Sequence, residues 1–532
     1  MRRIDDCQQT LLIDPFEYLG PKRKDLLETG WSGLFQKSLL EKIPVNEIKA
    51  CFHEQMGRPT KELRTMLGVV LLQQMFDLTD EETIRQLAFN AEWHYALNLS
   101  WEDDDTKYLC ERTLRMYRSL VMELKIDDIL FRSLTDALLD KLKISTKKQR
   151  LDSTHIRSDM RRLSRLELFR RTIEKFLKTM HREHARLLKK SVAEELVERY
   201  LKKKKGYFSQ VKPSEAQEAL KQAAEDLLTL VETFRTHRKI RGMGVFGLLQ
   251  RVLNEQCHVS GESEAAKVEI KDPKKVSSDS LQNPSDEDAA YSGHKGQGYQ
   301  VQVMETYQEK KSEGKSEEKP TPPNLITYIH VEPANVSDNE TPPRAIEETK
   351  ERGCAPKELL TDSLYGSDDN VSKAAQEGVT LIAPAPGKPK SKETMLILDD
   401  FTVQEETGEV VSCPGGEAPC EVRKGKEDKW IIYFEAKGCQ ECDHRDYCCV
   451  GLDGDHKLEY TPKQWRLAQR RVAEESEEFR EKYRWRSGIE ALNAKLKRKM
   501  GLGRLRVRGR ERVRLAVKLK ALGWNIFQAA RA

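Results

Sequence analysis

A run of short apolar strands that alternate with helices between residues 299 and 383 places the strongest constraint on how this chain can fold. The β-branched runs Tyr299–Thr306 and Leu325–Val331 flank a charged loop, which predicts a hairpin. Strands that then alternate with helices at this spacing are typical of an α/β domain with some parallel pairing. The segments expected after the hairpin are a helix over Thr341–Arg352, a strand over Glu358–Thr361, a helix over Val371–Glu377 and a strand over Val379–Ala383.

Helical patterns dominate the chain before this region. We expect helices through residues 35–145, one of which begins at a capping box formed by Thr79 and Glu82. The helix over Arg112–Leu124 carries surface arginines, which suit either a DNA groove or an ordinary packing or dimerisation face. A short strand at 148–156 follows. Residues 162–253 are then predicted to be helical, and residues 258–287 to form an exposed loop.

The cysteines are concentrated in one part of the chain. Six of the eleven lie between Cys413 and Cys449, which indicates a local metal site in a reducing compartment rather than a disulfide framework. Four thiolates around Zn²⁺ leave no open position, so the role of such a site would be structural. Free buried thiols without metal are the alternative. The expected zinc ligands are Cys413, Cys439, Cys442 and Cys448, with Cys420, Cys449 or His444 as substitutes.

Length and hydropathy set the class of protein. At about 150 residues per domain, a chain of 532 residues predicts three to four domains. The N-terminal sequence has no apolar stretch long enough for a signal peptide, and the best apolar run, Leu67–Leu72, is too short to span a bilayer. We therefore expect a soluble cytoplasmic protein that has no contact with a membrane.

Basic residues gather at the C-terminal end. The whole chain has a net charge of only +5, yet from Glu481 onward sixteen Lys and Arg residues face three Glu residues. The rest of the chain is therefore acidic. Such an uneven distribution is typical of a surface that binds a polyanion, and it favours nucleic acid over a merely solvated helix face.

The sharpest chemical signal lies on the helix expected over Glu474–Lys499. At about 100° per residue, one face of this helix displays a phenol, a guanidinium, a carboxylate and an ammonium group over about 21 Å. Cations can hold phosphates while a carboxylate holds a divalent metal, so this set suits a phosphodiester. An ordinary surface helix with i,i+4 pairs is the alternative. The four side chains are Tyr483, Arg486, Glu490 and Lys497, opposite an apolar face of Trp485, Ile489, Leu492 and Leu496.

Two further carboxylates occupy the kind of position that metal chemistry requires. Asp152 lies within the predicted strand at 148–156, and Asp362 follows the strand at 358–361. Ligands of open α/β sheets bind at the carboxyl ends of strands, and Mg²⁺ prefers oxygen donors. An aspartate at the end of a strand is also a common turn or cap residue.

These residues carry a resemblance to a known family. The spacing Tyr483-x₂-Arg486-x₃-Glu490-x₆-Lys497 resembles the Y-R-E-K signature of the DDE transposases of bacterial insertion sequences. The segments Leu151–Thr154 and Leu360–Gly366 are similar to the family's first-Asp and second-Asp segments. The helices around 58–124 resemble its N-terminal insertion-sequence domain, so the resemblance covers most of the chain.

The resemblance implies a role for each residue. An RNase H-like core would bind two Mg²⁺ ions per active site through Asp152, Asp362 and Glu490. The phosphates of double-stranded DNA would be held by Tyr483, Arg486 and Lys497, together with the arginines of the basic end of the chain, Arg504, Arg506 and Arg508.

One departure from the family leaves the first carboxylate open. A mostly helical stretch, residues 158–287, separates Asp152 from the next good strand, whereas the simplest family cores run directly into a hairpin. The alternatives to Asp152 are Asp159, Asp286 and Asp288.

The expected architecture is an α/β RNase H-like core with a helical N-terminal domain and two insertions, one helical and one small, β-rich and cysteine-containing. The expected segments are an N-terminal DNA-binding or dimerisation domain at 1–145, the first core strand at 146–157, a helical insertion and loop at 158–287, the remaining core at 288–386, the cysteine-cluster insertion at 387–470, and the catalytic Glu helix with basic helices at 471–532.

The expected function is that of a DNA transposase that cuts at insertion-sequence ends and joins the 3′-OH to target DNA, working as a homodimer on the bacterial nucleoid. Two alternatives remain open. One is an Mg²⁺-dependent nuclease of the same fold without strand transfer, and the other is a non-catalytic DNA-binding protein derived from a transposase.

Overall fold

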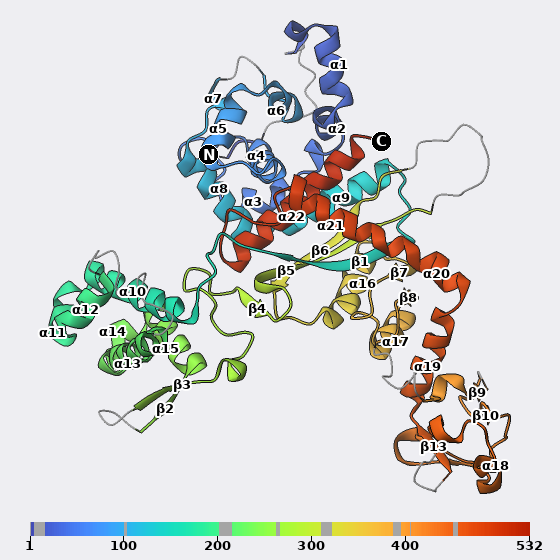
Figure 1. The fold of residues 1–532 in the computed structure, drawn as a ribbon. Coiled ribbons are helices and arrows are strands. Elements are labelled where there is room, and N and C mark those ends of the chain that lie inside the picture. Colours follow the sequence, from blue (N-terminus) through green and yellow to red (C-terminus); the bar gives the residue numbers. More distant parts are fainter. Residues whose placement is uncertain are drawn as a thin grey trace.

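A computed structural model describes residues 2–4, 16–100, 104–201, 215–261, 267–309, 322–386, 395–404, 406–450 and 456–532. Its centre is a mixed sheet with helices from both ends of the chain on one face, and two smaller regions extend away from this centre (Figure 1). The predicted α/β class is confirmed.

The central sheet contains both antiparallel and parallel pairs. Its longest strands, β1 (Lys148–Ile156), β5 (Gly296–Thr306) and β6 (Ile326–Pro333), pair antiparallel, with β5 in the middle. The short strands β7 (Glu358–Leu360) and β8 (Thr380–Ile382) continue the sheet in parallel on the other side of β1. The predicted hairpin is therefore present as β5 and β6, and β4 (Ala290–Ser292) pairs with the start of β5.

One edge of β1 is covered only in part. β7 pairs with residues 148–150, and the segment Gly503–Leu505 bonds to the backbone of Arg157. In the described residues no strand pairs with this edge between the two contacts. We call residues 151–156 the uncovered edge of β1, because no described strand pairs with them on this side. Side chains of this segment reach the candidate site.

Helices from both ends of the chain cover one face of the sheet around a shared core. The C-terminal helix α22 (Arg510–Ala529) packs against α4, α9 and β6, and Asn525 pairs with both the N–H and the C=O of Ile326 at 2.8 Å. The capping box at Thr79 is present at the start of α5. The helices of this part are α1 (Pro21–Thr29), α2 (Trp31–Ser38), α3 (Val45–Lys49), α4 (Leu63–Met75), α5 (Asp80–Phe89), α6 (Ala91–Ala96), α7 (Asp104–Lys107), α8 (Glu111–Glu123) and α9 (Ile126–Lys141).

The helical region, residues 165–281, forms a separate body with its own apolar core. Residues 258–287, expected to be a loop, contain the hairpin β2 (Cys257–Ser260) and β3 (Lys267–Ile270), so that expectation was wrong. The hairpin forms because Val268 and Ile270 alternate with charged residues and pack on the helices. The helices are α10 (Arg165–Glu183), α11 (Ala185–Ser191), α12 (Glu194–Leu201), α13 (Ala216–Phe234), α14 (Arg238–Arg241) and α15 (Gly244–Gln256).

The cysteine region, residues 396–460, is small and built from short strands. It follows two helices that cover the far face of the sheet, α16 (Thr341–Glu351) and α17 (Asp368–Gln376). Its elements are β9 (Thr402–Val403), β10 (Val410–Ser412), β11 (Glu421–Lys424), β12 (Trp430–Tyr433), α18 (Ala436–Gln440) and β13 (Lys457–Tyr460).

The single helix expected over 474–499 was wrong. The chain forms α19 (Pro462–Glu474), α20 (Glu477–Tyr483), a 3₁₀ turn at Arg484–Ser487 and α21 (Gly488–Lys499). Arg150 causes the break, because its guanidinium donates to the carbonyl of Trp485 at 2.6 Å and occupies the space that a Cβ at Gly488 would need. A side chain that enters the hydrogen-bond ladder in this way interrupts an α-helix.

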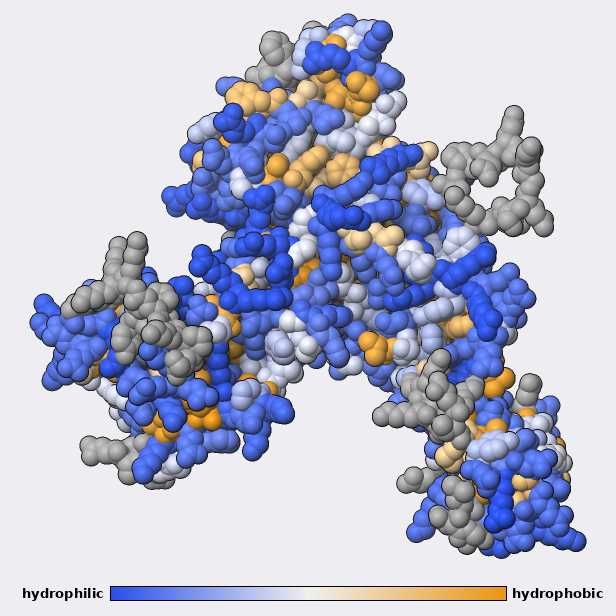
Figure 2. Space-filling view, in the orientation of Figure 1, coloured by the Kyte–Doolittle hydropathy of each residue, from blue (hydrophilic) through white to orange (hydrophobic). Residues whose placement is uncertain are grey.

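The face of the molecule seen in Figure 2 is largely hydrophilic, with small scattered apolar areas. Within the described residues, every helix is too short or too polar to cross a membrane.

Candidate active site

Asp152 lies on the uncovered edge of β1 and faces α21. Asn493 donates to its Oδ2 at 3.1 Å, and a guanidinium nitrogen of Arg486 lies 3.4 Å from its Oδ1. The residue is 8% exposed, and burial raises the pKa of its carboxyl group to about 6. Nearby Arg486 opposes this rise, while the charges of Asp362 and Asp338 add to it.

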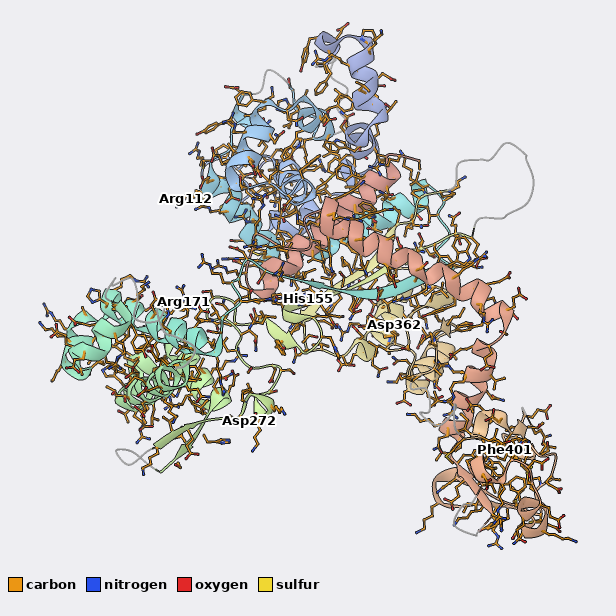
Figure 3. The ribbon with its side chains drawn as sticks, in the orientation of Figure 1. Arg112, His155, Arg171, Asp272, Asp362 and Phe401 are labelled. Carbon is orange, nitrogen blue, oxygen red and sulfur yellow. The ribbon has the colours of Figure 1, made fainter. Side chains whose placement is uncertain are left out.

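Asp362 and Glu490 approach the same point from two other elements. Asp362 follows β7 and accepts a hydrogen bond from the backbone N–H of Leu364 at 2.8 Å, which holds the turn at the end of the strand. Glu490 lies in the first turn of α21. Figure 3 shows Asp362 at the sheet, close to the C-terminal helices.

Arg486 joins the three carboxylates. Its guanidinium lies 3.4 Å from Asp152, 3.7 Å from Asp362 and 2.6 Å from Glu490. A single cation therefore touches oxygens from β1, from the end of β7 and from α21. The structure brings together four of the residues that the sequence singled out, although the helix that carries them is broken.

Negative charge is concentrated around this guanidinium. Burial also raises the pKa of Asp362, and the charge of Asp338 adds to the rise. Two half-buried carboxylates that disfavour each other's ionised form gain stability from a cation between them. Arg486 supplies one positive charge to a place where three carboxylates converge.

Oxygen donors of this kind are those that Mg²⁺ prefers. In the described part of the chain, no three His, Cys, Asp or Glu side chains are arranged to hold a metal ion already. At this site Arg486 contacts all three carboxylates. Their oxygens are of the type that suits a divalent ion, and the buried Oδ1 of Asn493, which has no hydrogen-bond partner, is a further oxygen beside Asp152.

Two residues at the site were missed in the sequence. Asp338 lies just before α16 and accepts hydrogen bonds from Gln302 at 2.7 Å and from Ser153 at 3.3 Å, next to Asp152. Its signal in the sequence was weak, because Asp338 lies several residues after the predicted strand, whereas Asp362 follows its strand directly. Asn493 lies three residues after Glu490, which places both on the same side of α21.

Tyr483 and Lys497 flank the carboxylates. Tyr483 stacks on Phe479, and burial raises the pKa of its phenol, with a further contribution from Asp362 and Asp152. Lys497 is half-buried on α21, and burial lowers the pKa of its ammonium group. Both side chains that were expected to hold phosphates are therefore within electrostatic range of Asp152.

Arg504, Arg506 and Arg508 lie apart from the carboxylates. They pair with aspartates: Arg506 with Asp77 at 3.5 Å, and Arg508 with Asp159 at 3.1 Å. Arg506 and Arg508 line a cavity of about 750 Å³ between the N-terminal helices and the C-terminal segment. Arg504 is 4.0 Å from Asp159 and has a side chain that is 70% exposed.

The alternatives to Asp152 are engaged elsewhere. Asp159 pairs with Arg508, and Asp286 accepts from the hydroxyl of Tyr299 at 2.5 Å. Asp288 accepts from the backbone N–H of Arg510 at 2.9 Å. None of these three described residues forms an ion pair with Arg486, whereas Asp152 does.

Four of the predicted thiols line one cavity of about 490 Å³ in the cysteine region. Burial raises the pKa of the Cys439 thiol, and the neighbouring Cys413, Cys448 and Cys442 add to the rise. A Cβ at Gly415 would lie 3.1 Å from Cys442 Sγ and 3.6 Å from Cys413 Sγ, so this glycine leaves space for the sulfurs. Soft donors around one cavity fit Zn²⁺, although they are not arranged as a finished site.

Comparison with known families agrees with this geometry. Residues 412–530 match the family described as Transposase DDE domain, and residues 34–113 match the family described as Transposase domain (DUF772). Comparison with curated proteins and with solved structures gave no match. Two segments of the chain are therefore similar to transposase domains, and the match to the DDE family supports a DNA-processing enzyme. This similarity agrees with the resemblance that the Y-R-E-K spacing indicated.

Proposed function

We propose that this protein is a DNA transposase, which cuts DNA at the ends of an insertion sequence and joins the freed 3′-OH to target DNA. The observation that carries the proposal is the contact of Arg486 with Asp152, Asp362 and Glu490, which come from three separate elements. The match that covers residues 412–530 includes Glu490, whereas Asp152 and Asp362 lie outside both matched segments.

The catalytic core in this proposal is RNase H-like. The strand order β6-β5-β1-β7-β8 supports it, with three antiparallel strands followed by two parallel ones. Of the two strand carboxylates, Asp152 lies on β1 and Asp362 follows β7. Residues 158–287 and 387–470 are then insertions between core elements, and 1–145 is an N-terminal domain. Separate apolar clusters in the helical and cysteine regions support this division.

Asp152, Asp362 and Glu490 would hold two Mg²⁺ ions, which supply charge neutralisation and activation of the attacking oxygen when bound. The chain's own groups do the rest. Asn493 holds Asp152 in place, and Arg486, when it leaves the carboxylates, becomes free to bind a phosphate. Lys497 and Tyr483 would orient the DNA end beside them.

The reaction begins at the phosphodiester of the transposon end. Water attacks phosphorus, the bond to the 3′ oxygen breaks, and the freed 3′-OH then attacks a target phosphate in the same manner. A site that holds two phosphates in turn needs mobile cations, and Arg486 and Lys497 are cations of this kind.

The test uses duplexes taken from the DNA that borders the coding sequence, with Mg²⁺ and a supercoiled target. We expect end cleavage and joined products. Cleavage without joining would favour the nuclease alternative, and binding without cleavage would favour the non-catalytic one. Active complexes are expected to contain two copies of the chain, bound to DNA in the bacterial cytoplasm.

The cysteine region is proposed to bind one structural Zn²⁺ through Cys413, Cys439, Cys442 and Cys448. Their common cavity and the space left by Gly415 support this assignment. Four thiolates would leave no position open for substrate, so this metal would take no part in DNA cleavage.

A further inference from the structure

Two lysines approach the uncovered edge of β1 from opposite sides of the site. Lys497 extends from α21, and Lys295 comes from the turn between β4 and β5. The ammonium group of Lys295 donates to the hydroxyl of Ser153 at 3.1 Å. Ser153 follows Asp152 directly, so Lys295 reaches the strand beside a carboxylate of the candidate active site.

These lysines differ from Arg486, the other cation of the site, because no described carboxylate forms an ion pair with them. Arg486 pairs with three carboxylates, whereas neither Lys295 nor Lys497 has an ion-pair partner among the residues that the structure describes. The ammonium group of Lys295 is also close enough to disfavour the charged form of Lys497. Burial is the main cause of the lowered pKa of Lys497, and Lys295 is the next.

A nearby histidine offers no compensation. His155 lies on β1 (Figure 3), and its buried Nε2 atom faces Gly298 of β5. Burial, followed by the charges of Lys497 and Lys295, lowers the pKa of His155 to about 4, so the imidazole is neutral at pH 7. Two ammonium groups without an ion-pair partner therefore act on the same part of β1, where an anion would stabilise them.

We propose that Lys295 and Lys497 together bind one phosphate group of the DNA strand next to Asp152. The inference rests on the proposed function, and it adds Lys295 as a DNA-binding residue contributed by the β4–β5 turn. A phosphate suits the place because an ammonium group acts as a point charge with three freely rotating donors. Asp152 acts electrostatically on Lys497, so a phosphate held by Lys497 would lie near the reacting one.

The first test measures the salt dependence of binding to a fluorescein-labelled duplex of mixed sequence, without divalent metal. The variants are Lys295→Ala, Lys497→Ala and the double variant, and Lys274→Ala is the control because Lys274 is an exposed lysine of the 3₁₀ turn Pro273–Lys275, outside the site. Each neutralised phosphate contributes about 0.9 to the slope of log K against log salt. If both lysines hold one phosphate, the slope of the double variant should be smaller than that of the wild type by about 0.9. The single variant Lys295→Arg keeps the positive charge and should have the wild-type slope.

Two results would overturn the proposal. If the Lys295→Ala variant binds DNA with the same affinity and salt dependence as the Lys274→Ala control, Lys295 is not part of the DNA-binding surface. A slope that falls by about 1.8 in the double variant would assign the lysines to two separate phosphates. Lys295 is exposed, so its substitution leaves the core intact.

The second test is lysine acylation followed by mass spectrometry, with and without the same duplex. We expect the duplex to protect Lys295 and Lys497 but not Lys274. Equal reactivity of Lys295 in the bound and free protein would contradict the inference alone. Failure of the wild-type protein to bind the duplex would contradict both the inference and the proposed function.

Discussion

The central sheet and the helices that share its apolar core form what we call the sheet region. This region contains far more apolar packing than the cysteine region does. The core of the sheet region draws residues from Trp31 to Ala529, so it connects the N-terminal helices, β5, β6, α21 and α22. The cysteine region has a separate cluster of only seven buried apolar residues. Small cores of this kind usually need a crosslink or a metal to stay folded. The comparison indicates that apolar packing holds the carboxylates in place, and it agrees with our proposal that thiols and a metal hold the cysteine region.

Metal removal is the strongest way to break this comparison. Zinc bound by four cysteines contributes about 10 kcal/mol to the folding of a small domain. We expect about one Zn²⁺ per chain by elemental analysis, and chelation should unfold the cysteine region while the sheet region keeps its melting transition. Cys442→Ser should do the same, and Cys51→Ser, at an exposed thiol outside the region, should not. A chain purified without zinc, and with one unchanged transition, would contradict this prediction.

Glu490→Gln tests the carboxylates that the large core supports. The substitution keeps the size of the side chain and removes the charge that anchors a metal, so DNA cleavage should fall by about three orders of magnitude. DNA binding should persist or tighten, because one negative charge beside the phosphates is gone. Glu481→Gln, at an exposed glutamate before the 3₁₀ turn, is the matched control. Wild-type cleavage by Glu490→Gln would remove α21 from the active site.

Much of the sheet region was predictable because its signals are local. The hairpin, the capping box at Thr79 and the position of Asp362 after a strand follow from patterns within a few residues. The break at Arg484–Ser487 was not predictable, since Arg150 causes it from a strand far away in sequence. An arc drawn on an ideal helix brought Arg486 and Glu490 together correctly, because the 3₁₀ turn and α21 follow each other without a gap.

Asp338 shows why the candidate site was only partly visible. It lies in the connection between β6 and α16, and nothing in its neighbourhood indicates which part of the sheet it reaches. Its place depends on Gln300 and Gln302, which β5 presents to it. Strand order decides such contacts, and strand order is a long-range property of the chain.

The helical region is a third part of the molecule, and its apolar core is separate from those of the sheet region and the cysteine region. Phe246 is fully buried there, and Phe246→Ala should destabilise this region by about 4 kcal/mol. Phe131→Ala, at a buried position in the core of the sheet region, should cost a similar amount there. Hydrogen exchange should show faster opening confined to the altered region in each variant. Loss of protection across both regions in either variant would mean that the two cores unfold together.

The smallest expected effect is a pH dependence of the stability of the sheet region. Burial lowers the pKa of His330 on β6 to about 4, with Arg344 and Arg510 as further causes, whereas an unfolded histidine titrates near 6.5. The unfolded chain therefore binds the proton more tightly, so stability is lost as the pH falls from 6.5 towards 4. With partial exposure taken into account, this histidine should account for about 2 kcal/mol of the loss. Denaturant unfolding at pH 7 and pH 4.5 measures it, and His330→Gln should lose that much less stability than the wild type. Equal losses in the two proteins would show that His330 is solvated like an ordinary surface histidine, and the buried sheet would then contribute no pH dependence through it.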